Sequence, residues 1–210
     1  MSNMRLRRRL TAVATAALLL AAPMAHAMKI KQQNLVDLIS DSQNIVHGTV
    51  KSVTDGINDK GVPYTEVTIS VGSSAKGRKL DGQDVTFRQF GLLKPRTFPN
   101  GKTLLAVTPE GFPKWVEGET VVAFLREPAS LTGLQTTAGM GQGKFRQVNG
   151  KLVNEYANAG LFEGVEIDTA LTSPEERNMI TQPGAVDAAA FIDLVGRAVE
   201  GNWIESGEMK

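Results

Sequence analysis

The chain has 210 residues, of which 41% are hydrophobic and 21% charged, with 23 Lys/Arg against 22 Asp/Glu. It contains no cysteine, which excludes disulfide bonds, thiol catalysis, cysteine-ligated zinc and iron–sulfur clusters. Only two histidines are present, His26 and His47, so a site built from several histidine ligands is excluded as well.

The N-terminus has the pattern of an export signal. Four arginines between positions 5 and 9 precede the apolar run LTAVATAALLLAAPMA, and the small residues Ala25 and Ala27 stand where signal peptidase cleaves. We expect cleavage after Ala27, Sec export in preference to the twin-arginine route, and a mature protein in the periplasm or the medium. The run is short for a bilayer span, so a retained anchor is the weaker alternative.

Removal of residues 1–27 changes the charge balance. The remaining 183 residues (210 − 27) carry 19 Lys/Arg against 22 Asp/Glu, a net charge of about −3. Such a surface gives no electrostatic reason to expect nucleic acid or an anionic membrane as partner. No segment of this part is apolar enough to span a membrane, and its length suffices to bury a core without disulfides.

The expected mature chain begins with a short helix and three strands. Asn34 can cap a helix in which Leu35, Leu38 and Ile39 form one apolar face. Three stretches then alternate apolar and polar residues between turn-rich loops, which predicts antiparallel strands. These stretches are NIVHGTVKSV (44–53), YTEVTISV (64–71) and DVTFRQF (84–90).

Residues 91–118 follow, with four prolines and several glycines around the short apolar stretch TLLAV. We interpret them as a long ordered excursion, the kind of loop that often carries function. Its aromatic side chains are Phe98, Phe112 and Trp115. They either form a contact surface for a partner or fold down over one end of the barrel, and both interpretations stay open.

The next stretch, ETVVAFLRE (119–127), is apolar on both faces, which is typical of a central strand. Two further strands, LQTTAGMG (134–141) and KFRQV (144–148), are expected to pair with each other. Asn149-Gly150 then connects KFRQV to KLVNEY, because both residues tolerate the positive φ of a type I′ hairpin turn.

The last fifty residues are predicted to be helical. Ser173 and Pro174 have the pattern of a helix start. A second helix is capped by Asp187, carries an apolar stripe that includes Phe191, and ends at Gly201.

The stretch AGMGQGKFR (138–146) resembles a phosphate-binding loop but lacks its requirements. A Walker A loop needs glycine where Ala138 stands and a magnesium-binding hydroxyl where Phe145 stands. The chain also continues as a hairpin instead of entering the helix of a dinucleotide turn. We therefore interpret the glycines as part of the barrel wall, or as a bulge where the sheet bends.

The remaining candidates for acid–base chemistry are His47 and the close pair Glu117 and Glu119. No serine or acid is tied to His47 by a motif, which favours a surface or rim histidine. The two glutamates lie in a tight turn, whereas two-carboxylate hydrolysis needs carboxylates that face each other across a cleft. We therefore expect no catalytic residue, no cofactor and no metal.

The order of these segments resembles a group of uncharacterised exported bacterial β-barrel proteins. The matching stretches, between residues 34 and 150, are SDSQNIVHGTVKSV, YTEVTISVGSSAKG, VTFRQFG, WVEGETVVAFL and GMGQGKFRQ. The resemblance implies a fold and assigns no activity.

More distantly, the helix-then-strand opening and the KG after the second strand are similar to the netrin/TIMP-type module, an OB-like Greek-key barrel. Met28 stands where TIMP-type inhibitors have a zinc-chelating cysteine, so the likeness supplies no inhibitory residue.

These observations predict a mainly β protein: a small antiparallel Greek-key (OB-like) barrel with a short N-terminal helix and one or two C-terminal helices. The expected segments are a signal peptide (1–27), a β-barrel domain (28–160) and a C-terminal helical extension (161–210).

The predicted function is that of an exported, non-catalytic domain that binds an unknown exported protein or a polysaccharide, and not nucleic acid, through Phe98, Phe112 and Trp115. One alternative is an accessory protein or inhibitor of a secreted metalloprotease, which rests on the distant likeness alone. A second is a hydrolase that uses carboxylates only, with Glu119 as the residue to test.

Overall fold

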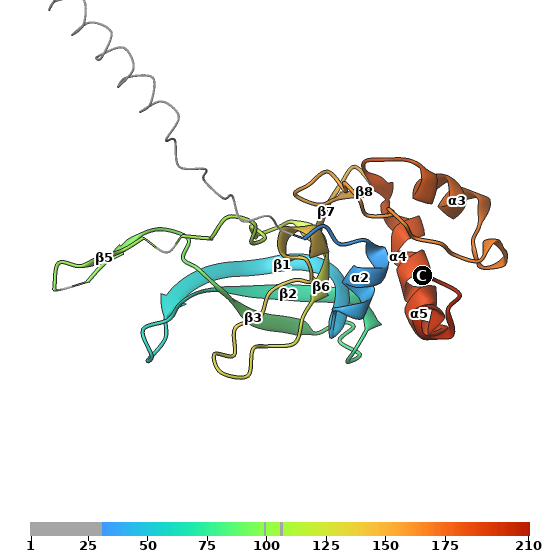
Figure 1. The fold of residues 1–210 in the computed structure, drawn as a ribbon. Coiled ribbons are helices and arrows are strands. Elements are labelled where there is room, and N and C mark those ends of the chain that lie inside the picture. The colour runs from blue at the N-terminus through green and yellow to red at the C-terminus, as the bar shows by residue number, and fades with distance from the viewer. Residues whose placement is uncertain (1–30, 99, 106) are drawn as a thin grey trace, which may run out of the picture. The chain divides into compact units, whose positions relative to one another are not determined.

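Two long antiparallel strands form the centre of the fold. The computed structural model describes residues 31–98, 100–105 and 107–210, so the expected signal peptide and its cleavage site lie outside the described residues. β1 (Asn44–Ile57) and β2 (Pro63–Lys76) pair along almost their whole length (Figure 1). Their register shifts at three points, and each shift is a bulge that bends the strands.

The other strands extend this pair into one seven-stranded antiparallel sheet of order β3-β2-β1-β6-β7-β8-β9. The added strands are β3 (Asp84–Phe90), β6 (Thr120–Leu125), β7 (Lys144–Val148), β8 (Lys151–Val153) and β9 (Val186–Asp187). β6 returns after a long connection to lie beside β1, so β6-β1-β2-β3 has the strand order of a Greek key.

The sheet is not closed into a barrel, which corrects the prediction of a closed barrel. β3 and β9 form its two edges and do not pair with each other. The physical reason lies in the turn after β7: Asn149 (φ 50°) and Gly150 (φ 75°) form the predicted tight hairpin turn and lead the chain into β8. β7 therefore pairs with β6 and β8 and does not reach β3.

Side chains are buried on both faces of the sheet, because successive residues of a strand point to opposite sides. On β1, Ile45 belongs to the cluster beneath the helices and Val46 to the cluster on the other face, as the alternation predicted. The cluster on the second face contains Val46, Val50, Val67, Ile69, Val71, Leu80, Phe87, Trp115, Val121, Ala123 and Leu125.

Gly48 is required where β1 and β2 come closest. A Cβ atom at this position would lie 2.2 Å from the backbone oxygen of Ser70, which no real side chain tolerates. The glycine follows one of the register shifts, so it permits the bend that curls the sheet.

The α-helices of the described residues begin at the predicted caps, except for the last one, which was not predicted. They are α2 (Leu35–Ser40), α3 (Pro174–Thr181), α4 (Ala188–Glu200) and α5 (Trp203–Ser206), with 3-10 turns η1 (Met140–Gly143) and η2 (Thr169–Leu171). Asn34 caps α2, Asp187 caps α4, and Ser173 with Glu176 forms a capping box on α3.

Helix α4 is part of the main core. The ring of Phe191 lies 5.2 Å from that of Phe145 on β7 and 6.3 Å from that of Phe124 on β6, measured between centroids. Residues 161–210 thus bury side chains against the sheet, and residues 31–210 form one compact unit. No helix among the described residues has the length and apolar character needed to cross a bilayer.

The stretch that resembled a phosphate loop adopts a different structure from the expected strand. Residues 134–139 form a bridge at Thr137 with Leu125 of β6, and the glycines then turn through η1. Gly139 has φ 57°, and a Cβ at Gly143 would lie 2.2 Å from the oxygen of Ala138. The prediction that LQTTAGMG pairs as a strand with KFRQV is wrong, because its second half must coil tightly to enter β7.

A separate two-stranded hairpin interrupts the connection from β3 to β6. Its strands are β4 (Arg96–Thr97) and β5 (Thr103–Leu104). Figure 1 shows this hairpin projecting away from the sheet, at the opposite end from α3, α4 and α5. We call residues 93–107 the arm.

Candidate functional site

The arm leaves the sheet at a point where the backbone is closely constrained. Leu92, fully buried, forms a bridge with Val107, and the amide of Thr108 donates to the oxygen of Leu92 at 3.2 Å. Gly91 has φ 125° and would bring a Cβ within 3.1 Å of the Cα of Thr108. The entry and exit of the arm therefore lie side by side and are fixed to the body.

Asp55 of β1 holds the base of the arm. Its Oδ2 accepts from the amide of Leu93 at 2.9 Å, while Arg96 forms an ion pair with its Oδ1 and donates to its backbone oxygen at 2.9 Å. The Asp55 side chain is only 8% exposed. Burial opposes ionisation of this carboxyl, but the hydrogen bond from Arg96, the amides of Leu93 and Lys94 and the Arg96 charge outweigh it, so the pKa of Asp55 lies below its usual value.

Hydrogen bonds join the described residues on the two sides of the tip of the arm. Phe98 donates its amide to the oxygen of Lys102 at 2.8 Å, and Gly101, with φ 79°, donates to the oxygen of Phe98 at 2.9 Å. Behind the turn, the hydroxyls of Thr97 and Thr103 lie 3.0 Å apart across the two strands. The described residues of the arm are thus linked across its two strands and anchored at its base.

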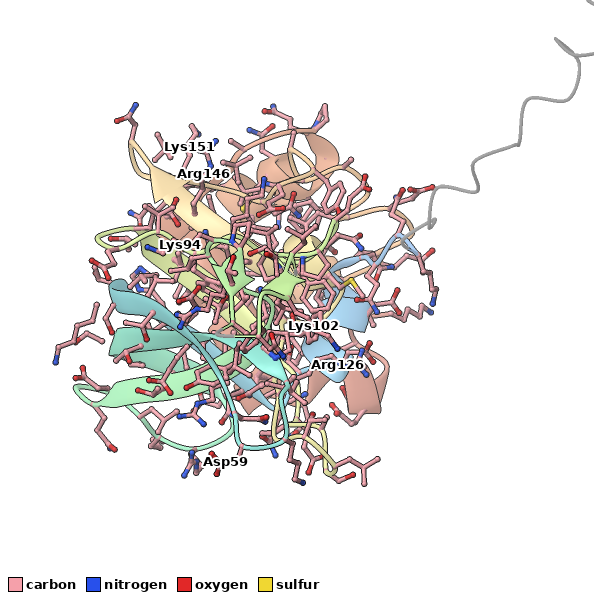
Figure 2. The ribbon with its side chains drawn as sticks, turned by 90° about the vertical axis from the view of Figure 1, so that its left-hand side faces the viewer. Asp59, Lys94, Lys102, Arg126, Arg146 and Lys151 are labelled. Atoms are coloured by element: carbon pink, nitrogen blue, oxygen red, sulfur yellow. The ribbon has the colours of Figure 1, made fainter. Side chains whose placement is uncertain are left out.

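The surface of the arm is both apolar and cationic. Leu93, Phe98, Leu105 and Val107 are exposed, and Leu105 is 69% exposed. No Asp or Glu occurs in the sequence between Arg88 and Glu110, whereas three basic residues do. Two of these, Lys94 and Lys102, are exposed at the end that faces the viewer in Figure 2.

Neither lysine takes part in the ion pairs found within the described part of the chain. Exposed apolar side chains gathered on one segment are unusual on a monomeric protein and mark contact surfaces. The arm is therefore the strongest candidate for a binding surface.

The three aromatic residues proposed from the sequence do not share one surface. Phe98 is exposed at the tip of the arm and Phe112 is half-buried, whereas Trp115 is only 7% exposed. The Trp115 ring meets that of Phe87 edge-on at 5.3 Å, and its Nε1 donates to Oε1 of Gln89 at 3.2 Å. Trp115 thus belongs to the core, as the alternative interpretation of these aromatics allowed.

Lys144, the lysine of the glycine-rich stretch, is buried beside Trp115. Its Nζ donates to Oε2 of Glu119 and to the oxygen of Lys114, both at 2.6 Å, and lies 5.3 Å from the centre of the Trp115 ring. The side chain of Lys144 is 5% exposed and that of Glu119 25%. A lysine with these partners stabilises the return of the excursion onto the sheet.

Glu117, two positions before Glu119, is also hydrogen-bonded within the protein. Oε1 of Glu117 accepts from the amide of Val53 at 2.9 Å, so Glu117 ties the turn before β6 to β1. Glu117 and Glu119 thus bond to different partners and do not face each other across a cleft, which hydrolysis by two carboxylates requires.

His47 is half-buried on the face covered by α4. Its Nε2 lies 3.3 Å from Oε1 of Gln147, and the side chains around the adjoining small cavity include Val122, Phe191 and Val195. Ser73, which lies opposite His47 on β2, also lines that cavity, whereas its lining includes no carboxylate. In the described part of the chain, no three His, Asp or Glu side chains are grouped so that they could hold a metal ion.

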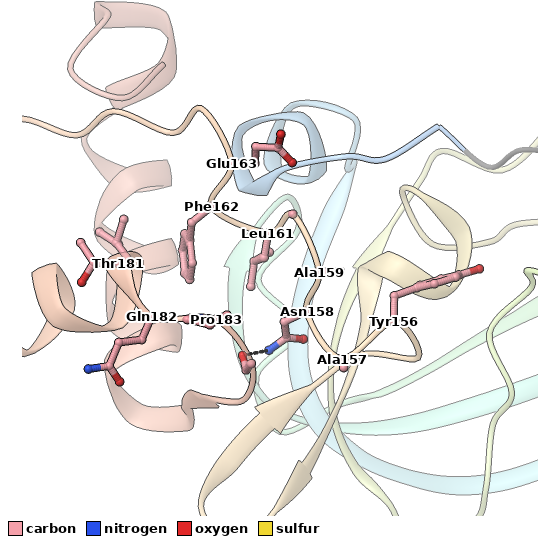
Figure 3. Close-up of a pocket in the computed structure, with 13 residues that line it drawn as sticks. Tyr156, Ala157, Asn158, Ala159, Leu161, Phe162, Glu163, Thr181, Gln182 and Pro183 are labelled. Carbon is pink, nitrogen blue, oxygen red and sulfur yellow. Dashed lines mark hydrogen bonds between the residues drawn. The ribbon is translucent and has the colours of Figure 1, made fainter.

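The loop after β8 lines a cavity of about 570 Å³ together with the end of α3 (Figure 3). The loop contains two buried asparagines, Asn154 and Asn158. The backbone amide of each donates to the side-chain oxygen of the other, at 2.8 and 2.9 Å. Nδ2 of Asn158 donates to the oxygens of Leu152 and Gly184, the latter bond being the dashed line in Figure 3.

These asparagines organise the loop. Ala157 (φ 53°) and Asn158 (φ 59°) are both left-handed, a conformation that costs about 1 kcal/mol or more for alanine. The reciprocal bonds compensate for that cost. Nδ2 of Asn154 donates to the oxygen of Gln142 at 3.0 Å, so the side-chain oxygen and nitrogen of both asparagines are already hydrogen-bonded within the protein. Sequence analysis missed this pair; its only signal was two asparagines four residues apart after a strand.

Comparison of the chain with protein-family models, with curated proteins and with solved structures found no match.

Proposed function

We propose that the protein is an exported, non-catalytic binding protein that holds a macromolecular partner with its arm. The observation that carries the proposal is the surface of this hairpin: Leu93, Phe98 and Leu105 are exposed next to two lysines, while Asp55 fixes the base. An apolar surface held in a defined shape loses little conformational entropy when a partner covers it.

The arm offers two kinds of contact. A two-stranded ribbon has free backbone groups along its outer edges, to which an extended segment of a partner can add as a strand. Its apolar side chains supply buried area, and Lys94 and Lys102 attract an anionic partner from a distance. In this proposal Phe98 keeps its predicted contact role, whereas Trp115 acts from the core by fixing the return of the excursion to β6.

The test replaces the apolar side chains of the arm. Phe98→Ser with Leu105→Ser removes the largest exposed groups, and we expect the affinity for the partner to fall at least about 10-fold, because a few residues dominate most interfaces. Leu131→Ser is the matched control, since Leu131 is 86% exposed and lies outside the arm. The measurement is capture of partners from the periplasmic extract on the immobilised protein, read by mass spectrometry.

Unchanged circular dichroism of the serine variants establishes that the fold survives. Loss of the captured partner in the arm variant, with retention in the Leu131→Ser control, supports the proposal. Equal capture by both variants overturns it.

A further inference from the structure

The charges of the protein are unevenly distributed between its two ends. Residues 31–154 carry 15 Lys/Arg and 11 Asp/Glu, a net charge of +4. Residues 155–210 carry 3 Lys/Arg and 11 Asp/Glu, a net charge of −8. The acidic part forms α3, α4 and α5, and Figure 1 shows these helices at the opposite end from the arm.

A groove of about 640 Å³ lies between α3 and α4 in this acidic part. Leu171, Ala189 and Ala190 provide small and apolar lining, and four carboxylates line the groove: Glu175, Glu176, Asp187 and Asp193. Glu175 and Asp193 are exposed, and Asp193 pairs with Arg197.

One arginine, Arg197, also lines the groove. Its guanidinium forms ion pairs with Glu176 and Asp193 and donates a hydrogen bond to the backbone oxygen of Leu171. Its charge is therefore already neutralised, and the groove remains anionic.

We propose that the partner of the arm is a second copy of this chain, whose α3–α4 groove receives the arm. This inference rests on the proposed binding role of the arm. The two surfaces match in chemistry: the arm presents lysines and apolar side chains, and the groove presents carboxylates around an apolar lining.

A second copy fits this pattern better than a general polyanion does. A polyanionic surface would be attracted to the arm but repelled by the −8 charge of residues 155–210, whereas a second copy uses both ends. Because the two surfaces are different and lie at opposite ends, the contact is head-to-tail. An open chain of copies has a free arm at one end and a free groove at the other. It can therefore grow further, or close into a ring when these two ends meet.

Two sets of variants separate the surfaces. The arm variant is Lys94→Glu with Lys102→Glu, and the groove variant is Glu175→Lys with Asp193→Asn. Ala189→Trp is a second groove variant that blocks the space without a change of charge, since Ala189 is exposed on the first turn of α4. Lys60→Glu with Lys79→Glu is the matched control, because both lysines are exposed outside the arm.

The measurement is the mass of the purified protein by sedimentation velocity and light scattering, over about 1 to 100 µM. For the unaltered protein we expect the mass to rise with concentration in about 20 mM salt and to fall toward that of the monomer in about 500 mM salt. The arm and groove variants should each stay monomeric, with an apparent dissociation constant raised at least about 10-fold, and the lysine control should associate normally.

Mixing gives the decisive result. An equimolar mixture of the arm variant and the Ala189→Trp variant still contains one intact arm and one intact groove, so it should form a 1:1 dimer. The dimer should not grow further, because its remaining arm carries carboxylates and its remaining groove is blocked and still anionic. A mixture that stays monomeric overturns the head-to-tail contact, as does a lysine control that dissociates like the arm variant.

The test of self-association and the test of partner binding by the arm can fail independently. If the unaltered protein is monomeric under all these conditions, self-association is overturned. The proposed function then still stands wherever the serine variants of the arm lose a captured partner. If those variants lose nothing either, both proposals fail.

Discussion

Asp55 and Arg96 lie 41 positions apart in the chain and form the ion pair that joins the arm to β1. The same carboxylate accepts from the amide of Leu93, so one buried side chain fixes the first residues of the arm at two points. Together with the bridge between Leu92 and Val107, the charge of this residue of the sheet therefore holds the base of the arm in place.

Asp55→Asn should loosen the arm while the sheet remains folded. The amide loses the ion pair and cannot accept as strongly from Leu93, and we expect the free energy of unfolding to fall by about 1 to 3 kcal/mol. Trypsin should then cleave faster after Arg96 and Lys102, which mass spectrometry of the fragments measures.

Asp84→Asn is the control for that experiment. Asp84 pairs with Lys51 on the surface, where solvent screens the two charges, so removal of this pair should leave the arm and the fold unchanged. Equal cleavage of the arm in the two variants would contradict the anchoring role of Asp55.

Acid should release the arm in the same way. The pKa of Asp55 in the folded protein is below the ordinary value of 3.8, so its ionised form stabilises the fold at every pH above that value. The contribution is lost as the pH falls below about 3.8 and through the lower folded-state pKa. Hydrogen exchange of the Leu93 amide should therefore accelerate below that pH, after correction for intrinsic exchange.

The Asp55→Asn protein serves as the reference for the acid experiment. Its Leu93 amide should exchange fast at all pH values, without the additional acceleration below pH 3.8. An identical pH profile in the two proteins would show that another group controls the arm.

The strands and helices that the sequence predicted are those whose determinants are local. Alternation in NIVHGTVKSV placed Ile45 and Val46 on opposite faces, and Ser173 and Asp187 capped the helices that the sequence assigned to them. The arm was anticipated only as an irregular excursion, because strands of two residues are too short to show an alternating pattern. Its base depends on Asp55, which lies 41 positions before Arg96.

The open sheet and the 3-10 turn within AGMGQGKFR were not predicted, for a related reason. Whether β7 reaches β3 depends on the position of the whole sheet, which no local pattern encodes. The burial of Lys144 likewise depends on Trp115 and Glu119, which come from the distant return of the excursion. Contacts between residues so far apart in the chain cannot be predicted from the pattern of neighbouring residues.

Lys144→Met should show that the buried lysine has a structural role. The change removes a cation held by Glu119 and the oxygen of Lys114, and we expect the free energy of unfolding to fall by about 1 to 3 kcal/mol, a loss limited by the partial exposure of Glu119. Urea unfolding followed by circular dichroism measures the loss.

Glu119→Gln keeps an oxygen that can accept from Lys144, so it should cost less than Lys144→Met. The double variant should be less destabilised than the sum of the two single changes, because the two groups contact each other directly. Strict additivity would contradict the pairing. A hydrolytic activity that disappears in Glu119→Gln without loss of stability would instead favour carboxylate chemistry at this position.

Phe191→Ala tests whether residues 161–210 are an appendage or part of the core. The Phe191 ring is fully buried against Phe124 and Phe145, so its removal leaves a cavity between α4 and the sheet. Phe→Ala changes at such positions cost about 3 to 5 kcal/mol, and we expect one cooperative urea transition at a lower midpoint. Leu131→Ala, at an exposed position, should change the free energy of unfolding by no more than about 0.5 kcal/mol. An early separate transition of the helices, with the sheet unfolding as before, would mean that the C-terminal segment folds independently of the sheet.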